Sequence, residues 1–153
     1  GYIRFDRTGL PDLAEPDDRG VRWFGAPPEL AALTIGATGV TVHTAIEVAR
    51  RLWNSEKIRV SVLDVSRIKP VNEAAIKLAT DARRIVTLEE HFLAGGLGSL
   101  VLETLNDANV HVPVLRIGVP DCYTWEMGGR EVIWEKYGLT PPQVAERILR
   151  WVG

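Results

Sequence analysis

Short apolar runs alternate with segments of helical spacing along most of the chain, and this alternation limits the possible folds more than any other feature. The run at 58–65 is rich in β-branched residues, which favour strands. Apolar residues spaced three and four apart favour helices that bury one face. Expected strands occupy 31–35, 58–65, 84–88 and 112–117, and expected helices occupy 42–53, 72–80, 97–105 and 141–152. Strands and helices in alternation predict a three-layer α/β domain with a mostly parallel sheet.

Size and composition match a soluble globular domain. Of the 153 residues 46% are hydrophobic and 25% are charged, so one sizeable core is expected. The net charge of −2 provides no basic field for nucleic acid or for an anionic membrane. Cys122 is the only cysteine, which excludes an internal disulfide and a cysteine-rich zinc site. No apolar run approaches the roughly 20 residues of a membrane span and no signal peptide is recognisable, so we expect a cytoplasmic protein.

The first 29 residues differ in composition from the rest. Residues 2–5 form a strand-like run, and residues 8–28 hold four of the nine prolines together with an acidic cluster. This composition predicts a linker or a surface arm over 8–29, with one short strand at 21–24. A compact body is expected over 30–153. Because the chain starts at a glycine, we also expect a processed chain, a trimmed chain or a fragment.

Two glycine-bearing turns join expected strands to expected helices, at 36–39 and at 95–99. A helix that follows such a turn can bind an anion through its free N–H groups. Neither turn matches GxGxxG or GxxxxGK[ST], so the usual nucleotide-binding pattern is missing. Close packing of a helix against a strand requires the same small residues. We favour this packing interpretation for Gly95, Gly96 and Gly98.

Glu89, Glu90 and His91 end an expected strand directly before the second glycine turn. Many α/β domains bind ligands at this edge of the sheet, where a carboxylate beside an imidazole can perform acid–base catalysis. Alternatively, one of these side chains caps the next loop or braces an interface. We favour this structural role, with His91 buried beside a carboxylate at an interface. His43 and His111 are isolated from other metal-ligand residue types, so no metal site is predicted.

An ordered set of motifs from about residue 30 to the end resembles the C-terminal domain of transketolases, especially the split, two-subunit kind. The motifs are IGATG at 35–39, Asp64 with Lys69-Pro70, VTLEEH at 86–91, GGLGS at 95–99, GVPD at 118–121 and YGLT at 137–140. YGLT is similar to deoxyxylulose phosphate synthase as well. The resemblance implies an α/β/α fold with about five strands, one of them antiparallel. It gives interface or structural roles to Glu89, Glu90, His91, Gly95, Gly96 and Gly98.

The resemblance extends to the opening run. Arg4 and Arg7 flank its end, and either guanidinium could bind a phosphate or carboxylate, with solvated surface charge as the alternative. Residues 1–7 are similar to the last strand of the pyrimidine-binding domain that precedes the C-terminal domain in this family. The arginine that closes that strand helps to bind the substrate phosphate, a role that falls on Arg7. Segment 8–29 would then be the linker, and 30–153 the transketolase C-terminal domain.

The cofactor-binding motif of the family has no counterpart in the sequence. Thiamine enzymes hold thiamine diphosphate through Mg²⁺ with a Gly-Asp-Gly run, which does not occur here. We therefore expect no catalytic residue and no cofactor bound by this chain alone, with thiamine diphosphate and Mg²⁺ in the complete enzyme. A partner chain would carry the thiamine-binding domains in a homo- or hetero-oligomer.

Three functions are compatible with these features. The leading one is a C-terminal section of a transketolase-like enzyme that transfers a two-carbon ketol unit between sugar phosphates, with dimer contact and bracing as this domain's task. The second is the equivalent domain of a 2-oxoacid dehydrogenase beta subunit or of deoxyxylulose phosphate synthase. The third is a stand-alone α/β module with a small ligand at the glycine turns, and the arginine-bearing opening strand argues against it.

Overall fold

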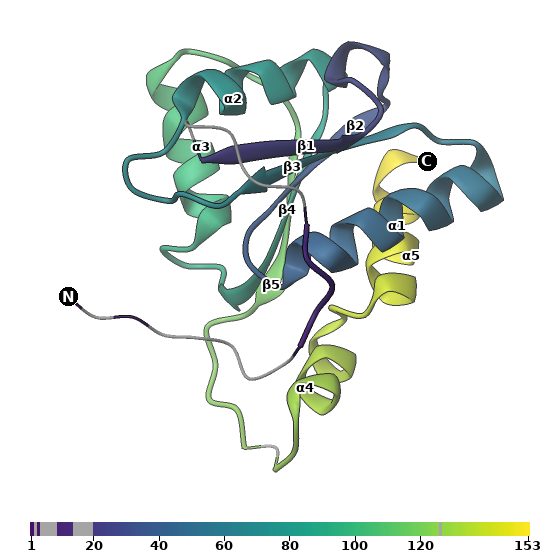
Figure 1. Cartoon of the computed structure of the whole chain (residues 1–153), viewed down its shortest axis with the longest axis vertical. Coiled ribbons are helices and arrows are strands. Elements are labelled where there is room, and N and C mark those ends of the chain that lie inside the picture. Colours follow the sequence, from purple (N-terminus) through teal and green to yellow (C-terminus); the bar gives the residue numbers. More distant parts are fainter. Residues whose placement is uncertain (2, 4–8, 14–19, 126) are drawn as a thin grey trace.

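Five strands form one sheet with helices on both faces (Figure 1). The computed structural model describes residues 1, 3, 9–13, 20–125 and 127–153. The spatial order of the strands is β1-β3-β2-β4-β5, and their bounds are β1 (Val21–Gly25), β2 (Leu33–Ala37), β3 (Val60–Val65), β4 (Ile85–Phe92) and β5 (Val114–Val119). β1 pairs antiparallel with β3, whereas the other pairings are parallel. The predicted three-layer α/β fold with one antiparallel strand is confirmed.

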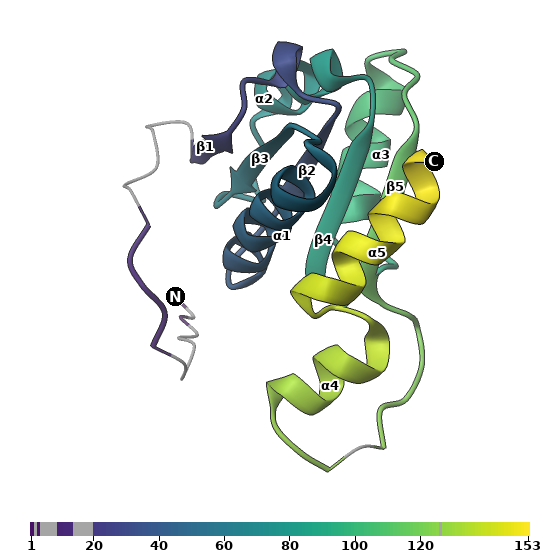
Figure 2. The ribbon, with the colours of Figure 1, turned by 90° about the vertical axis from the view of Figure 1, so that its right-hand side faces the viewer.

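Two pairs of helices cover the two faces of the sheet. The helices are α1 (Thr41–Glu56), α2 (Glu73–Leu78), α3 (Leu97–Asp107), α4 (Arg130–Tyr137) and α5 (Pro141–Val152), with short 3₁₀ turns at Pro28–Leu30 and Ala79–Ala82. α1 and α5 lie on one face, and α2 and α3 lie on the other (Figure 2). None of the helices in the described ranges is both long enough and apolar enough to cross a membrane.

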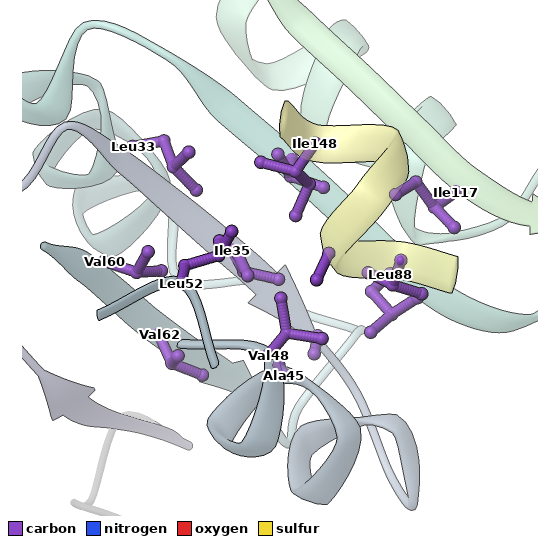
Figure 3. Packing of buried hydrophobic residues seen from close by; sticks show 14 of the residues in the cluster. Leu33, Ile35, Ala45, Val48, Leu52, Val60, Val62, Leu88, Ile117 and Ile148 are labelled. Carbon is purple, nitrogen blue, oxygen red and sulfur yellow. The ribbon is translucent and has the colours of Figure 1, made fainter. Parts of the chain in front are cut away.

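Alternate side chains of each strand supply two hydrophobic cores. Val86 and Leu88 of β4 face α1 and α5, whereas Ile85 faces α2 and α3. In the larger core, Ile35 of β2 and Ile148 of α5 are fully buried (Figure 3). Burial of one such side chain contributes about 1.5–3 kcal/mol, so the sheet is held firmly from both sides. The ends of its strands are therefore fixed positions on which a site can be built.

The chain differs from expectation at three places. The strand expected at 84–88 continues to Phe92. The short strand predicted within the 8–29 segment is β1, whose hydrogen bonds to β3 attach residues 21–25 to the sheet. α4 was not predicted, because none of its residues is buried and its sequence therefore carries no apolar stripe. The predicted strand at 1–7, with Arg7, lies outside the described residues except for residues 1 and 3.

Candidate functional site

The parallel strands all end at one edge of the sheet, and polar side chains gather there. β2, β3, β4 and β5 run in the same direction, so residues that follow their last positions share this carboxyl edge. Two carboxylates, Asp64 of β3 and Glu89 of β4, are buried at the edge. Buried carboxylates require partners, because an unpaired charge in the interior is costly. The partners of each carboxylate therefore define what this edge can do.

Glu89 caps the helix that follows its own strand. Its side chain is 0% exposed, and its carboxylate accepts hydrogen bonds from the backbone N–H groups of Leu97, at 2.7 Å, and Gly98, at 3.0 Å. The first N–H groups of a helix have no partner within the helix, and the helix dipole favours negative charge at this end. The N-terminus of α3 is thus occupied by a carboxylate of the same chain. An external anion would have to displace Glu89 to bind there.

Three glycines make the close approach around Glu89 and α3 sterically feasible. A Cβ at Gly96 would overlap Oε2 of Glu89 and would lie 2.7 Å from the carbonyl oxygen of Phe92. A Cβ at Gly118 of β5 would lie 2.9 Å from Cγ of Glu89. A Cβ at Gly98 would lie 2.7 Å from Nε of Arg116. The contacts support the packing interpretation of this turn, whereas Gly95 has open space and a φ of +73° instead.

The loop between β4 and α3 is tied down by side chains from two elements. The hydroxyl of Ser99 donates to the carbonyl of Leu93 at 3.0 Å and accepts from the N–H of Gly95 at 3.0 Å. Nη2 of Arg116, from β5, donates to the Ser99 hydroxyl at 3.2 Å and also to the carbonyl of Leu93. The glycine turn is therefore a fixed connection.

Glu90 and His91 do not form the pair that the sequence suggested. Oε1 of Glu90 accepts a hydrogen bond from Nε of Arg130 at 2.8 Å, which ties the end of β4 to α4. The guanidinium of Arg130 also lies 5.8 Å from the ring centre of Trp134. His91 is exposed in the single chain, so the predicted burial beside a carboxylate does not occur within it. Any burial of His91 must come from another polypeptide.

Asp64 forms a buried ion pair that sequence reasoning missed. Its side chain is 1% exposed, and Nε of Arg22 on β1 donates to Oδ2 at 2.6 Å. Burial raises the pKa of Asp64 above its ordinary value of 3.8, while the hydrogen bond from Arg22 and the charges of Arg22 and His43 act in the opposite direction. A charged residue in the β-branched run 58–65 was the available signal. The pair joins the antiparallel edge strand to the sheet.

This buried pair leads to a prediction for the pH dependence of stability. A folded-state pKa above the unfolded value means that protonated Asp64 favours folding below about pH 4, and this contribution disappears as pH rises through the folded-state pKa. Asp64→Asn does not titrate at this position. The unfolding free energy of the natural chain minus that of the variant should therefore fall from pH 4 to pH 7, measured by urea titration. A difference that rises with pH would mean that attraction to Arg22 outweighs burial.

The remaining candidates complete this description. Arg7 lies outside the described residues. Within the described ranges no group of three or more His, Cys, Asp or Glu is arranged to hold a metal ion. The described carboxyl edge therefore shows side chains committed to holding loops and helices together.

Comparisons with known proteins identify the family. The family model described as "Transketolase, C-terminal domain" matches residues 29–144. One of the two subunits of the apulose-4-phosphate transketolase of Phocaeicola vulgatus is 39% identical over 154 residues, which cover 99% of this chain and 48% of that protein. The 1-deoxy-D-xylulose-5-phosphate synthase of Heliobacterium modesticaldum is 46% identical over 119 residues, which cover 77% of this chain and 18% of that protein.

Solved structures give the same result. A split-gene transketolase, described as an inactive beta4 tetramer, superposes with a TM-score of 0.78 at 31% identity, over 94% of this chain and 47% of that chain. A transketolase of Campylobacter jejuni, 17% identical, has the same fold with a TM-score of 0.66. This chain spans less than half the length of the relatives it matches. The family match over most of its length shows that the chain belongs to the transketolase C-terminal domain family.

Proposed function

We propose that this chain is the C-terminal section of a thiamine-diphosphate-dependent transketolase-like enzyme, which transfers a two-carbon ketol unit between sugar phosphates. Within that enzyme it contributes subunit contacts and braces the cofactor-binding domains. The observation that carries the proposal is the match to a split transketolase, which extends over 99% of this chain but only 48% of the relative. The rest of the catalytic apparatus then belongs to other domains or to a partner chain, in an assembly that we expect to be cytoplasmic.

The residues of this chain do not fit the cofactor of the family. Mg²⁺ needs oxygen ligands with free lone pairs, supplied by carboxylates or amides. At the carboxyl edge, both oxygens of Glu89 accept N–H groups of α3, and Asp64 is paired with Arg22. In the part of the chain that the structure describes, no alternative cluster of acidic or histidine ligands is available. The cofactor would therefore be held by the thiamine-binding domains.

The side chains at the end of β4 and the following glycines would serve assembly. Glu89, Gly96 and Gly98 fix the start of α3, and Glu90 ties β4 to α4 through Arg130. Gly95 has a positive φ within the turn. His91, exposed beside these groups, would contact a neighbouring subunit. None of these side chains is assigned a catalytic role.

A second candidate is 1-deoxy-D-xylulose-5-phosphate synthase activity in the complete protein. The synthase of Heliobacterium modesticaldum is more similar per aligned residue, at 46% identity against 39% for the apulose-4-phosphate transketolase. Its similarity covers 77% of this chain, whereas that of the transketolase covers 99%. We give greater weight to coverage, because the longer match includes the arm and the opening run as well as the compact body.

Reconstitution tests the proposed function. The chain is mixed with the thiamine-binding domains of the same enzyme, thiamine diphosphate, Mg²⁺, a ketose phosphate labelled in its first two carbons and an aldose phosphate. The label is expected to move to the acceptor in the mixture and to stay in place with either component alone. Formation of 1-deoxy-D-xylulose 5-phosphate would support the second candidate. A stable complex with neither activity would contradict the proposal.

Arg7 is proposed to bind the substrate phosphate in the assembled enzyme. An arginine–phosphate contact is bidentate and charge-assisted, worth about 1.5–3 kcal/mol. Arg7→Ala is therefore expected to raise KM for a phosphorylated sugar by roughly 10- to 100-fold and to leave KM for the unphosphorylated sugar nearly unchanged. Steady-state kinetics on the reconstituted enzyme measures both values. An equal KM for the phosphorylated sugar in both proteins would make Arg7 a surface charge.

A further inference from the structure

The loop that follows β5 exposes three large apolar side chains. Tyr123 is 86% exposed, Trp125 is 84% exposed and Met127 is 95% exposed. Every other large apolar side chain in the described ranges is less exposed than these three. Isolated exposed apolar residues are common, but three within five positions, including a tryptophan and a tyrosine, are typical of residues that become buried on binding. We call these three residues the aromatic loop.

The aromatic loop is held on an anchored base. The rings of Tyr123 and Trp125 lie with their centres 6.0 Å apart, so the two side chains contact each other in the absence of any partner. The hydroxyl of Thr124 lies 3.1 Å from that of Tyr137, at the end of α4. α4 itself is tied to β4 by Arg130 and Glu90. A surface that is already arranged in this way loses little conformational freedom on binding.

The position of the loop indicates where its partner lies. The loop emerges at the carboxyl edge of the sheet, and the described part of the N-terminal arm, 9–13, lies toward the same end of the molecule (Figures 1 and 2). Leu13 of this arm packs against the core formed with α1 and α5. Polypeptide joined through the arm would therefore lie near this end. His91 and Phe92, both exposed at the end of β4, are on the same edge because Phe92 pairs with Val119, directly before the loop.

We propose that the aromatic loop is the contact by which this chain docks onto the thiamine-binding domains, and that it inserts into an apolar surface of low charge on them. The inference rests on the proposed function, since it takes the occupant from the part of the enzyme that the transketolase relatives contain beyond this chain. In those relatives about half of the length lies outside the matched region. A partner of at least domain size is therefore available to cover the three side chains.

Binding of engineered variants tests the inference. The double variant Tyr123→Ala/Trp125→Ala is expected to bind the thiamine-binding domains about 30-fold or more weakly than the natural chain, in sedimentation or calorimetry, because buried aromatic residues dominate interface energies. The side chains are exposed, so the urea midpoint of the free chain should not change. Met127→Glu is a second variant, which places a charge in the same contact and cannot disturb the core.

Trp53→Ala serves as the matched control. Trp53 is 45% exposed and lies on α1, so its loss removes a similar side chain from a different surface. Affinity of this control should equal that of the natural chain. If the natural chain assembles into an active enzyme and the loop variants bind equally well, the docking role is wrong while the proposed function stands. If the variants only abolish self-association of the free chain, the loop is an interface between copies, and the inference is likewise wrong. If the natural chain itself does not bind, the proposed function fails first.

Discussion

Glu89→Ala is expected to lower the free energy of unfolding of the chain by about 3–5 kcal/mol, since each hydrogen bond to a charged group contributes about 1.5–3 kcal/mol. The carboxylate accepts two backbone N–H groups, of Leu97 and Gly98, and is fully buried. Its removal leaves both donors without a partner in a dry interior and weakens the start of α3. Urea-induced unfolding, followed by circular dichroism, measures the loss.

Glu103→Ala is the control for this experiment. Glu103 lies on α3 with its side chain exposed, so its replacement should change stability by at most about 0.5 kcal/mol. Glu89→Gln keeps the shape of the side chain but not its charge, and should give an intermediate loss. A loss for Glu89→Ala no larger than that of the control would show that the carboxylate does not stabilise the helix.

Gly96→Ala is expected to destabilise the chain by about 3 kcal/mol, near the upper end for overpacking of a filled interior. The new methyl group would overlap the Glu89 carboxylate and would lie 2.7 Å from the Phe92 carbonyl oxygen. Because the carbonyl belongs to the backbone, the clash cannot be relieved by a side-chain rotation alone. The carboxylate would be displaced from the N–H groups that it accepts, so part of the cap would be lost as well.

Gly36→Ala is the matched control for Gly96→Ala. Gly36 is buried in β2, but a Cβ there would meet only the carbonyl oxygen of Val86 at 3.9 Å, an ordinary contact. Its cost should be clearly smaller in the same urea experiment. Because Gly96 and Glu89 are in contact, the double variant Gly96→Ala/Glu89→Ala should lose less than the sum of the single variants. Equal losses for Gly36→Ala and Gly96→Ala would contradict the crowded geometry.

Much of the fold could be predicted because its signals are local. The β-branched run at 58–65 and the helical spacing of 42–53 correspond to β3 and α1, and the sequence alternation implied the parallel order. α4 could not be predicted, since a helix without a buried face leaves no periodic pattern. The structural role expected for Glu89 is compatible with its position as a cap, a contact between residues eight and nine positions apart.

The contacts that sequence reasoning missed depend on distant strands. Arg22 and Asp64 are 42 positions apart and meet only because β1 adds to the sheet in antiparallel register. The burial expected for His91 fails for a similar reason. β2 ends at Ala37, opposite Leu88, so the last residues of β4 extend beyond their neighbour and lose its cover. Register between strands decides both outcomes, and no local pattern specifies it.

Titration of thiamine diphosphate with Mg²⁺ into the isolated chain tests the central claim most directly. Calorimetry is performed on the chain alone and on its mixture with the thiamine-binding domains. Binding is expected only in the mixture, because the buried carboxylates of this chain are already engaged by α3 and by Arg22. Micromolar binding by the chain alone would contradict the account of this domain as a brace without cofactor ligands.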